Sequence, residues 1–216
     1  MAVILYKGFG LDFNINIVFY IVGYLVGAIP FGLILAKSLA KVDVTKSGSN
    51  SIGATNVLRV LKEKDPKLAK KIAIATLALD ALKGVAVMLV ALAFGLGAAE
   101  LWMIGVLAVL GHCFSPYLKF EGGKGVATGV GVFALMLPIV TVATVVIYAI
   151  AAKTIKISSL SSLIGVASFI ALSYIIYPSI PYIDSHAPIW IISFLVFYKH
   201  IPNIIRLIKK EETRVV

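Results

Sequence analysis

Charged residues are scarce in this chain: they make up 14% of its 216 residues, against 60% for hydrophobic residues. The mean hydropathy of +1.02 is too high for a water-soluble globular protein. Cysteine is almost absent, and the single Cys113 excludes an intramolecular disulfide. The sequence also lacks a cluster of His, Cys and carboxylates with the spacing of a zinc site, so we expect no bound metal. The class that remains is an integral membrane protein.

Acidic residues are few as well, with 10 Asp and Glu against 20 Lys and Arg. Such a basic excess can indicate nucleic-acid binding. Here nearly all basic residues flank apolar runs, which is the distribution that orients membrane helices. We therefore expect the lipid bilayer, and no nucleic acid, as the partner of these charges.

Apolar runs long enough to cross a bilayer are the main feature of the sequence. We expect one helix in each of five runs, which are residues 15–36, 72–96, 101–118, 159–176 and 188–205. The run 126–152 has two alternatives. It forms either one long tilted helix or two short helices broken near Leu137 and Pro138, because proline removes a backbone donor and restricts the preceding residue.

The positions of the basic residues favour the second alternative. We place the basic segment 37–71 in the cytoplasm, so the N-terminus lies outside. If residues 126–152 cross once, the basic residues that follow fall outside; if they cross twice, these residues are cytoplasmic and Lys7 is the only external cation. We therefore predict an all-α protein with seven transmembrane helices, N-terminus outside, C-terminus cytoplasmic, and short fourth and fifth helices. No repeat or linker divides it, so residues 1–216 are expected to form one domain.

Two polar segments interrupt this apolar chain. Residues 46–59 read Lys-Ser-Gly-Ser-Asn-Ser-Ile-Gly-Ala-Thr-Asn-Val-Leu-Arg, and residues 120–128 read Phe-Glu-Gly-Gly-Lys-Gly-Val-Ala-Thr. Glycine lets backbone N–H groups approach an anion, and Lys or Arg supplies positive charge. If the chain is helical from Ala54, Asn56 and Arg59 share a face beside a helix N-terminus, which is a favourable phosphate site. Structural turns remain the alternative for both segments.

The second segment is not a nucleotide-binding P-loop. That motif needs a glycine where this chain has Leu118, and Ser or Thr where Gly125 follows Lys124. A third segment places His200, Asn203 and Arg206 three residues apart, so they can line one face of the last helix. Anchoring by positive charge is the alternative there, and it explains Arg206 alone.

Asp80 and Lys83 are charged residues within a hydrophobic run, three residues apart, and can form an ion pair. Charge within the membrane is costly and indicates a functional site. We expect this pair to orient the pocket more than to take part in chemistry. His112 and Cys113 are adjacent and point in different directions on a helix, so a Cys–His nucleophile is not expected.

Together these segments resemble the bacterial acyl-phosphate:glycerol-3-phosphate acyltransferase family of the PlsY type. That family has a Gly-Ser-Gly-Asn-Ile-Gly-Ala-Thr-Asn-x-x-Arg segment, a Gly-His-x-x-x-Pro-x-x-x-Phe-x-Gly-Gly-Lys-Gly-Val-Ala-Thr segment and a His-x-x-Asn-Ile-x-Arg segment. The counterparts here are residues 48–59, 111–128 and 200–206, and residues 159–162 match its Ser-Leu-x-Ser segment. The match covers most of the chain. It differs at Asn50 and Ser51, where the family has Gly-Asn.

The resemblance implies transfer of a fatty acyl group from acyl phosphate to the 1-hydroxyl of glycerol 3-phosphate, which gives 1-acylglycerol 3-phosphate and phosphate. It implies no cofactor. The expected location is the bacterial inner membrane, with a monomeric protein and a site that faces the cytoplasm. An organic-anion transporter is the alternative function, although the chain lacks the internal repeat typical of transporters.

The resemblance also implies roles for individual residues. The acyl phosphate group is expected to be held by Ser49, Thr55, Asn56, Gly122 and Gly123. Glycerol 3-phosphate is expected to be held by Arg59, Lys124, Ser159, His200 and Asn203. Ser51, Thr128 and Arg206 complete the expected binding set, and Asp80, Lys83 and His112 support it. Ser49, Asn56, Lys124 and His200 are expected nearest the chemistry, with a donor phosphate oxygen taking the hydroxyl proton and His200 as general base the alternative.

Overall fold

The computed structural model describes residues 14–213, and within this range the chain is helical with no strand. Lys7, the predicted external cation, lies outside the described residues. The α-helices are α1 Ile15–Gly27, α2 Phe31–Ala40, α3 Ala54–Leu61, α4 Pro66–Ala93, α5 Ala98–Cys113, α6 Val126–Met136, α7 Pro138–Ile155, α8 Ser158–Ile176, α9 Ala187–Lys199 and α10 Ile201–Ile208. Two 3-10 turns, η2 Val44–Lys46 and η3 Pro116–Leu118, complete the list.

Most of the predicted spans correspond to long helices. In the described part of the chain, five helical stretches are long and apolar enough to cross a bilayer: α1 with α2, α4, α5 with η3, α7 and α8. The α9–α10 pair, bent by 54°, is a sixth when it is counted as one span. The predicted break at Leu137 and Pro138 is confirmed, since α6 ends one residue before Leu137 and α7 begins at Pro138. Of the two helices expected to be short, α6 has 11 residues, but the expectation is wrong for α7, which continues to Ile155 and has 18 residues.

The first expected span is interrupted. Helix α1 ends at Gly27, and α2 starts after Pro30, which has no N–H group to continue a helix. A break at this depth leaves carbonyl groups that need donors. Ser115 Oγ donates to the Ala28 carbonyl at 2.8 Å, and Lys83 Nζ donates to the Ile29 carbonyl at 3.0 Å. The irregular backbone is therefore satisfied by side chains from other segments.

Helix α4 begins six residues before the expected start of the second span. Asp65 caps it, because its Oδ1 accepts from the N–H groups of Lys67 at 3.0 Å and Leu68 at 2.9 Å, and Pro66 occupies the first turn. The charged segment before residue 72 therefore contributes the first turns of α4.

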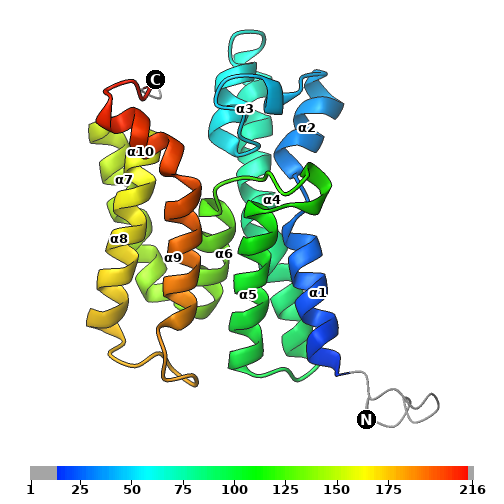
Figure 1. The fold of residues 1–216 in the computed structure, drawn as a ribbon, viewed down its shortest axis with the longest axis vertical. Coiled ribbons are helices and arrows are strands. Elements are labelled where there is room, and N and C mark those ends of the chain that lie inside the picture. Colours follow the sequence, from blue (N-terminus) through cyan, green and yellow to red (C-terminus); the bar gives the residue numbers. More distant parts are fainter. Residues whose placement is uncertain (1–13, 214–216) are drawn as a thin grey trace, which may run out of the picture.

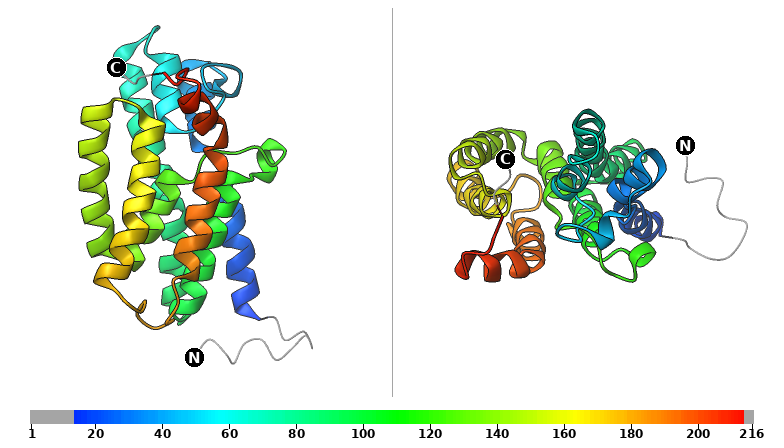
Figure 2. Two further views of the ribbon diagram at one scale, coloured as in Figure 1. Left: turned by 60° about the vertical axis from the view of Figure 1, so that its left-hand side comes forward. Right: turned by 90° about the horizontal axis from the view of Figure 1, so that it is seen from above.

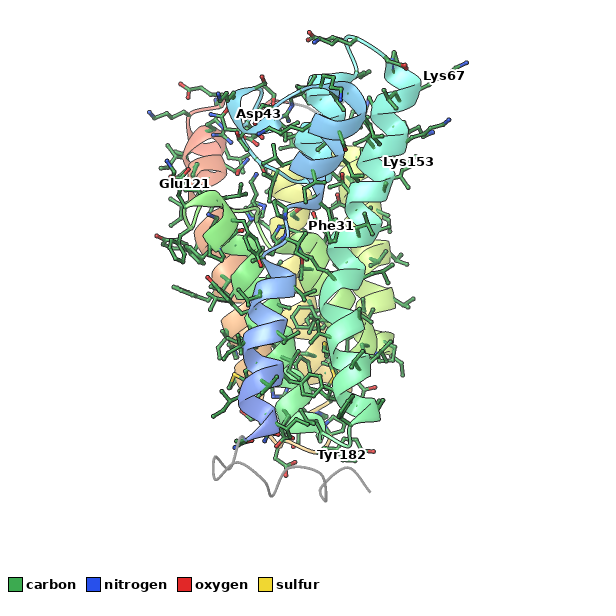
Figure 3. The ribbon with its side chains drawn as sticks, turned by 90° about the vertical axis from the view of Figure 1, so that its right-hand side faces the viewer. Phe31, Asp43, Lys67, Glu121, Lys153 and Tyr182 are labelled. Atoms are coloured by element: carbon green, nitrogen blue, oxygen red, sulfur yellow. The ribbon has the colours of Figure 1, made fainter. Side chains whose placement is uncertain are left out.

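The helices form two groups that lie side by side along the long axis (Figure 1). Helices α1, α4 and α5 make one group, α7, α8 and α9 the other, and α6 lies between them (Figure 2). Small residues allow the closest approaches: a Cβ on Gly27 would meet the backbone of Ala108, and one on Gly111 would meet the backbone of Tyr24. The polar segments around α3, α6 and α10 gather toward one end of this bundle, where Lys67 and Lys153 also lie, and Tyr182 lies at the opposite end (Figure 3).

Candidate active site

A polar cleft of about 130 Å³ opens where the two helix groups meet. It is lined by the residues before and at the start of α3, the start of α6, the start of α8 and the bend between α9 and α10. The expected site residues that line it are Ser49, Ser51, Thr55, Asn56, Arg59, Asp80, His112, Lys124, Ser159, His200 and Asn203. The fold therefore brings all four polar segments of the sequence to one place.

Asn56 holds the loop that precedes α3. Its Nδ2 donates to the carbonyls of Val44 at 3.0 Å, Ser47 at 3.1 Å and Ser51 at 2.8 Å, and its Oδ1 accepts from the Ser49 N–H at 2.8 Å. The side chain is 2% exposed. The amide nitrogen therefore has its donors used within the protein, while the oxygen accepts one of the two hydrogen bonds that it can take. These hydrogen bonds make Asn56 a positioning residue for the loop that carries Ser49, and because Asn56 also lines the cleft, its direct contact with substrate stays a prediction.

The Gly122–Gly123 pair lies against the end of α5. The N–H of Gly122 donates to the Cys113 carbonyl at 3.1 Å, and that of Gly123 to the His112 carbonyl at 2.9 Å. Neither residue lines the cleft. In this structure both N–H groups are bonded to α5 carbonyls, so a phosphate contact by these amides stays a prediction; the glycines allow the loop to approach α5 closely beside Lys124.

Three helix N-termini line the cleft with backbone N–H groups that are suited to an anion. Gly125, Val126 and Ala127 line the cleft at the start of α6, as do Ala54 and Thr55 of α3 and Ser158 and Ser159 of α8. The first N–H groups of a helix have no partner within the helix, and this end carries partial positive charge. Thr55 Oγ1 lies 3.4 Å from Ser158 Oγ, so α3 and α8 approach across the cleft.

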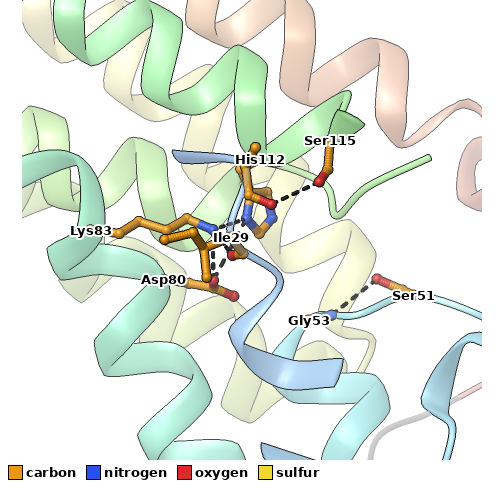
Figure 4. A network of polar contacts seen from close by, with 8 residues as sticks. Ile29, Ser51, Gly53, Asp80, Lys83, His112 and Ser115 are labelled. Carbon is orange, nitrogen blue, oxygen red and sulfur yellow. Dashed lines mark hydrogen bonds and ion pairs between the residues drawn. The ribbon is translucent and has the colours of Figure 1, made fainter. Parts of the chain in front are cut away.

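Asp80, Lys83 and His112 form a buried network beside the cleft (Figure 4). Lys83 Nζ lies 2.9 Å from Asp80 Oδ1 and 2.9 Å from His112 Nδ1, and it also donates to the Ile29 carbonyl. The predicted Asp80–Lys83 pair is confirmed. Lys83 does not line the cleft, whereas Asp80 and His112 do, so Lys83 ties α4, α5 and the break between α1 and α2 together behind the site.

Arg59 and Lys124 are cations that line the cleft and have no ionic partner among residues 14–213. Burial lowers the pKa of Lys124 to about 8, the Glu212 carboxylate opposes that effect, and Arg206 and Arg59 reinforce it. The carboxylates that line the cleft are Asp80 and Glu212, and each is already paired. The cleft therefore has positive charge available for an anion.

His200 lies at the bend between α9 and α10 and is 1% exposed. Its Nδ1 is 2.7 Å from the Val196 carbonyl, and since a carbonyl only accepts, Nδ1 carries the proton. In the neutral ring Nε2 is then an acceptor. Because His200 lines the cleft, this nitrogen is suited to accept a hydroxyl proton or hydrogen bond.

Glu212 is a site residue that sequence reasoning missed. Its carboxylate accepts from Ser159 Oγ at 2.8 Å, Asn203 Nδ2 at 2.6 Å and Arg206 Nε at 2.6 Å. Burial raises the pKa of Glu212, but the hydrogen bonds from Arg206, Asn203 and Ser159 outweigh it and leave the pKa below its usual range. No local pattern in the C-terminal sequence distinguishes Glu212 from its neighbour Glu211, because the partners of Glu212 come from α8 and α10.

Comparison with known proteins identifies the family. The glycerol-3-phosphate acyltransferase family matches residues 17–210. The glycerol-3-phosphate acyltransferase of Sulfurimonas denitrificans is 61% identical over 204 residues, which cover 94% of this chain and 98% of that protein. The corresponding protein of Nitratiruptor sp. is 58% identical over 202 residues, which cover 94% and 97%. The chain belongs to the glycerol-3-phosphate acyltransferase family.

Solved structures of the family have the same fold. The crystal structure of PlsY (YgiH), an integral membrane glycerol 3-phosphate acyltransferase, in its glycerol 3-phosphate form is 32% identical with a TM-score of 0.82, covering 93% of this chain and 96% of that one. Its lysophosphatidic acid form has a TM-score of 0.80 at the same identity, covering 93% and 95%. These matches favour the acyltransferase over the transporter alternative.

Four of the residues expected from the acyltransferase motifs lie away from the cleft in addition to Lys83. Gly122 and Gly123 pack on α5, as described above. Thr128 is fully buried in α6, and its Oγ1 has no hydrogen-bond partner. Arg206 reaches the site through Glu212, so it contacts a cleft residue without lining the cleft. Within the described residues no group of three His, Cys, Asp or Glu side chains could hold a metal ion.

An apolar groove of about 460 Å³ adjoins the polar cleft of this acyltransferase. Helices α4, α6, α7, α8 and α9 form its walls. The groove and the cleft are continuous, because five residues line both spaces: Leu77, Val126, Ala127, Tyr148 and Ser162. Ile74, Leu77 and Val145, which also line the groove, are among the exposed large hydrophobic residues, so the groove has a side that faces lipid.

Proposed function

We propose that this membrane acyltransferase takes a fatty acyl group from acyl phosphate and transfers it to the 1-hydroxyl of glycerol 3-phosphate. The observation that carries the proposal is the continuity of a cationic polar cleft with an apolar groove. Such a site suits one substrate with an anionic head and a fatty chain, and a second, small phosphate ester. The products would be 1-acylglycerol 3-phosphate and phosphate.

The two substrates would occupy different parts of the cleft. The acyl phosphate head would lie at the starts of α3 and α6, near Ser49, Thr55 and the free amides of residues 126–128, with its chain in the groove. Glycerol 3-phosphate would lie beside Arg59, Lys124, Ser159, His200 and Asn203. Ser51 would act through the turn before α3.

Because acyl phosphate is already activated, catalysis would come mainly from positioning and electrostatic stabilisation. The glycerol oxygen attacks the acyl carbon, the bond from that carbon to the phosphate oxygen breaks, and the hydroxyl proton passes to the departing phosphate. His200 would orient the hydroxyl through Nε2, and His200 as general base is the alternative.

Purified protein in detergent tests the proposal. We expect phosphate release from acyl phosphate only when glycerol 3-phosphate is present, together with formation of 1-acylglycerol 3-phosphate. Acyl-CoA is assayed in parallel with the same acceptor. Activity with acyl-CoA alone would contradict the acyl phosphate donor.

Replacement of His200 separates the two mechanisms. Asn retains a donor for the Val196 carbonyl, and Gln retains an acceptor toward the cleft, but neither titrates near neutral pH. Under substrate assistance we expect His200→Asn and His200→Gln to retain most of kcat. A collapse of kcat with an unchanged KM for glycerol 3-phosphate would support His200 as the base.

We also propose a membrane arrangement for the acyltransferase. Seven crossings, with the short α6 as one of them, place the N-terminus outside and the cleft on the cytoplasmic side of the bacterial inner membrane. The absence of a linker in the sequence supports one domain over residues 1–216. A functional monomer is part of the same proposal.

A further inference from the structure

The apolar groove ends at two stacked phenylalanine rings. Phe133 of α6 and Phe169 of α8 have ring centroids 3.9 Å apart and ring planes inclined by 16°. Both side chains are buried, at 7% and 3% exposure, and both line the groove. The groove therefore meets an aromatic surface with little freedom to move, since each ring is held by the other.

This aromatic pair lies at the end of the groove away from the polar cleft. Along α8 the groove runs from Ser162, which also lines the cleft, to Phe169, and along α6 it runs from Val126 to Phe133. At 1.5 Å per residue each path covers about 10 Å. Both phenylalanines are the lining residues of their helices farthest from the cleft.

Packed side chains lie beyond the pair. Trp102 of α5 meets Phe133 edge to face with centroids 6.3 Å apart, and Trp102 is 2% exposed. All three aromatic residues belong to the same buried core cluster. A chain that reached the pair could go no deeper without displacing this core.

We propose that the stacked Phe133–Phe169 pair sets the length of acyl chain that the enzyme prefers. The inference rests on the proposed function, because it takes the groove to hold the acyl chain of the donor. A chain that ends at the rings fills the groove. A longer chain must bend toward the lipid-facing side near Ile74 and Val145, and this strain moves the acyl carbon away from the acceptor hydroxyl.

One variant deepens the groove and another shortens it. Phe169→Ala removes half of the aromatic floor. Gly165→Leu adds a side chain midway, where a Cβ would meet Tyr148 at 3.6 Å and Thr144 at 3.9 Å, which are ordinary contacts. The backbone can therefore accept the larger residue while the groove loses depth.

The experiment measures kcat/KM for acyl phosphates from about ten to eighteen carbons, with each purified variant and saturating glycerol 3-phosphate. A methylene that does not fit an apolar pocket changes kcat/KM by roughly tenfold. We expect Phe169→Ala to shift the preferred donor to longer chains and Gly165→Leu to shift it to shorter chains. The KM for glycerol 3-phosphate should change in neither variant.

Phe194→Ala is the matched control, because Phe194 of α9 is 66% exposed and does not line the groove. Its chain-length profile should equal that of the wild type. If Phe169→Ala does not fold, Phe169→Leu is used, and Gly165→Leu remains a separate test. Profiles that stay unchanged in active variants would overturn the inference about the floor, whereas a wild type inactive with every acyl phosphate would overturn the proposed function.

Discussion

Asn50 and Ser51 show how this chain accommodates its one difference from the family motif. Asn50 has a φ of 56°, in the left-handed region, where the family usually has glycine. Asn is among the residues that tolerate this region best. Ser51 Oγ accepts from the Gly53 N–H at 3.3 Å and so makes a turn of the kind that Asn side chains also make. Both replacements preserve the backbone that leads into α3.

Substitution of Asn50 tests this explanation. Its side chain is exposed and makes no hydrogen bond within the described residues, so backbone conformation is the main factor. We expect Asn50→Gly to leave stability nearly unchanged, and Asn50→Val to cost roughly 1–2 kcal/mol because a β-branched residue is strained at positive φ. Thermal unfolding in detergent measures the difference. Equal stability of the two variants would contradict the explanation.

Lys124 gives a prediction about pH. Its pKa is lowered to about 8, chiefly by burial. Below this pH the ammonium is charged and can bind phosphate; as pH rises through about 8 the charge is lost. We expect kcat/KM for glycerol 3-phosphate to fall over that range, and Lys124→Arg to keep its activity to higher pH because Arg stays protonated.

The same residue provides a test at constant pH. Lys124→Ala should reduce transition-state binding by about 1.5–3 kcal/mol, which is the contribution of a charge-assisted hydrogen bond. Lys119→Ala is the control, because Lys119 lies in the same loop and does not line the cleft. Unaltered kinetics in Lys124→Ala would remove Lys124 from the site.

At the scale of secondary-structure elements, interruptions of helices build the cleft. The bend between α9 and α10 places His200 in it, and the start of α6 contributes Gly125, whose φ of 83° suits glycine. Pro202 lies beside the first of these interruptions and Gly125 beside the second. Such residues predict where helices end, but they do not predict which ends meet.

Glu212 joins two of these elements, α8 and α10, through the C-terminal segment. We expect Glu212→Ala to lose roughly 1.5–3 kcal/mol of stability, since it removes a carboxylate with three partners. That corresponds to a fall of about 3–12 °C in Tm for a chain of this size. The neighbouring Glu211→Ala is the control, because Glu211 is exposed and belongs to no ion pair in the described part of the chain.

The stability contributed by the Glu212 carboxylate is also expected to depend on pH. A carboxylate with a lowered pKa stabilises the fold at neutral pH, and the contribution is lost as pH falls through the folded-state pKa. The difference in Tm between wild type and Glu212→Ala should therefore shrink in acid. A difference that persists there would indicate a loss of packing instead of charge.

At the scale of the whole molecule, the proposed seven crossings can be tested with introduced cysteines. The only native cysteine, Cys113, is fully buried, which leaves a low background for labelling. We expect an impermeant maleimide to label Tyr182→Cys on intact cells, and Lys67→Cys and Lys153→Cys only after the membrane is opened. Labelling of Lys153→Cys on intact cells would support a single crossing by residues 126–152.

The sequence was sufficient for most of the spans and for the residue types of the site. Hydropathy and proline act locally, so they predict the long helices and the break at Leu137 and Pro138. The prediction of a short fifth helix was wrong. It was based on the positions of the basic residues, which indicate how many times the chain crosses the membrane but not how long each helix is. The length of α7 depends on where its last turn ends, at Lys156 with a φ of 60°.

The sequence by itself determined the membrane class, the family and the cationic, glycine-rich character of the site, because composition and motif spacing are properties of the chain. Only the tertiary structure decided which groups are free to bind substrate. The amides of Gly122 and Gly123 are taken by carbonyls of α5, Asn56 is taken by its own loop, and Glu212 completes the site from the tail. Hydrogen-bond partners distant in sequence make these assignments, and a linear pattern does not specify them.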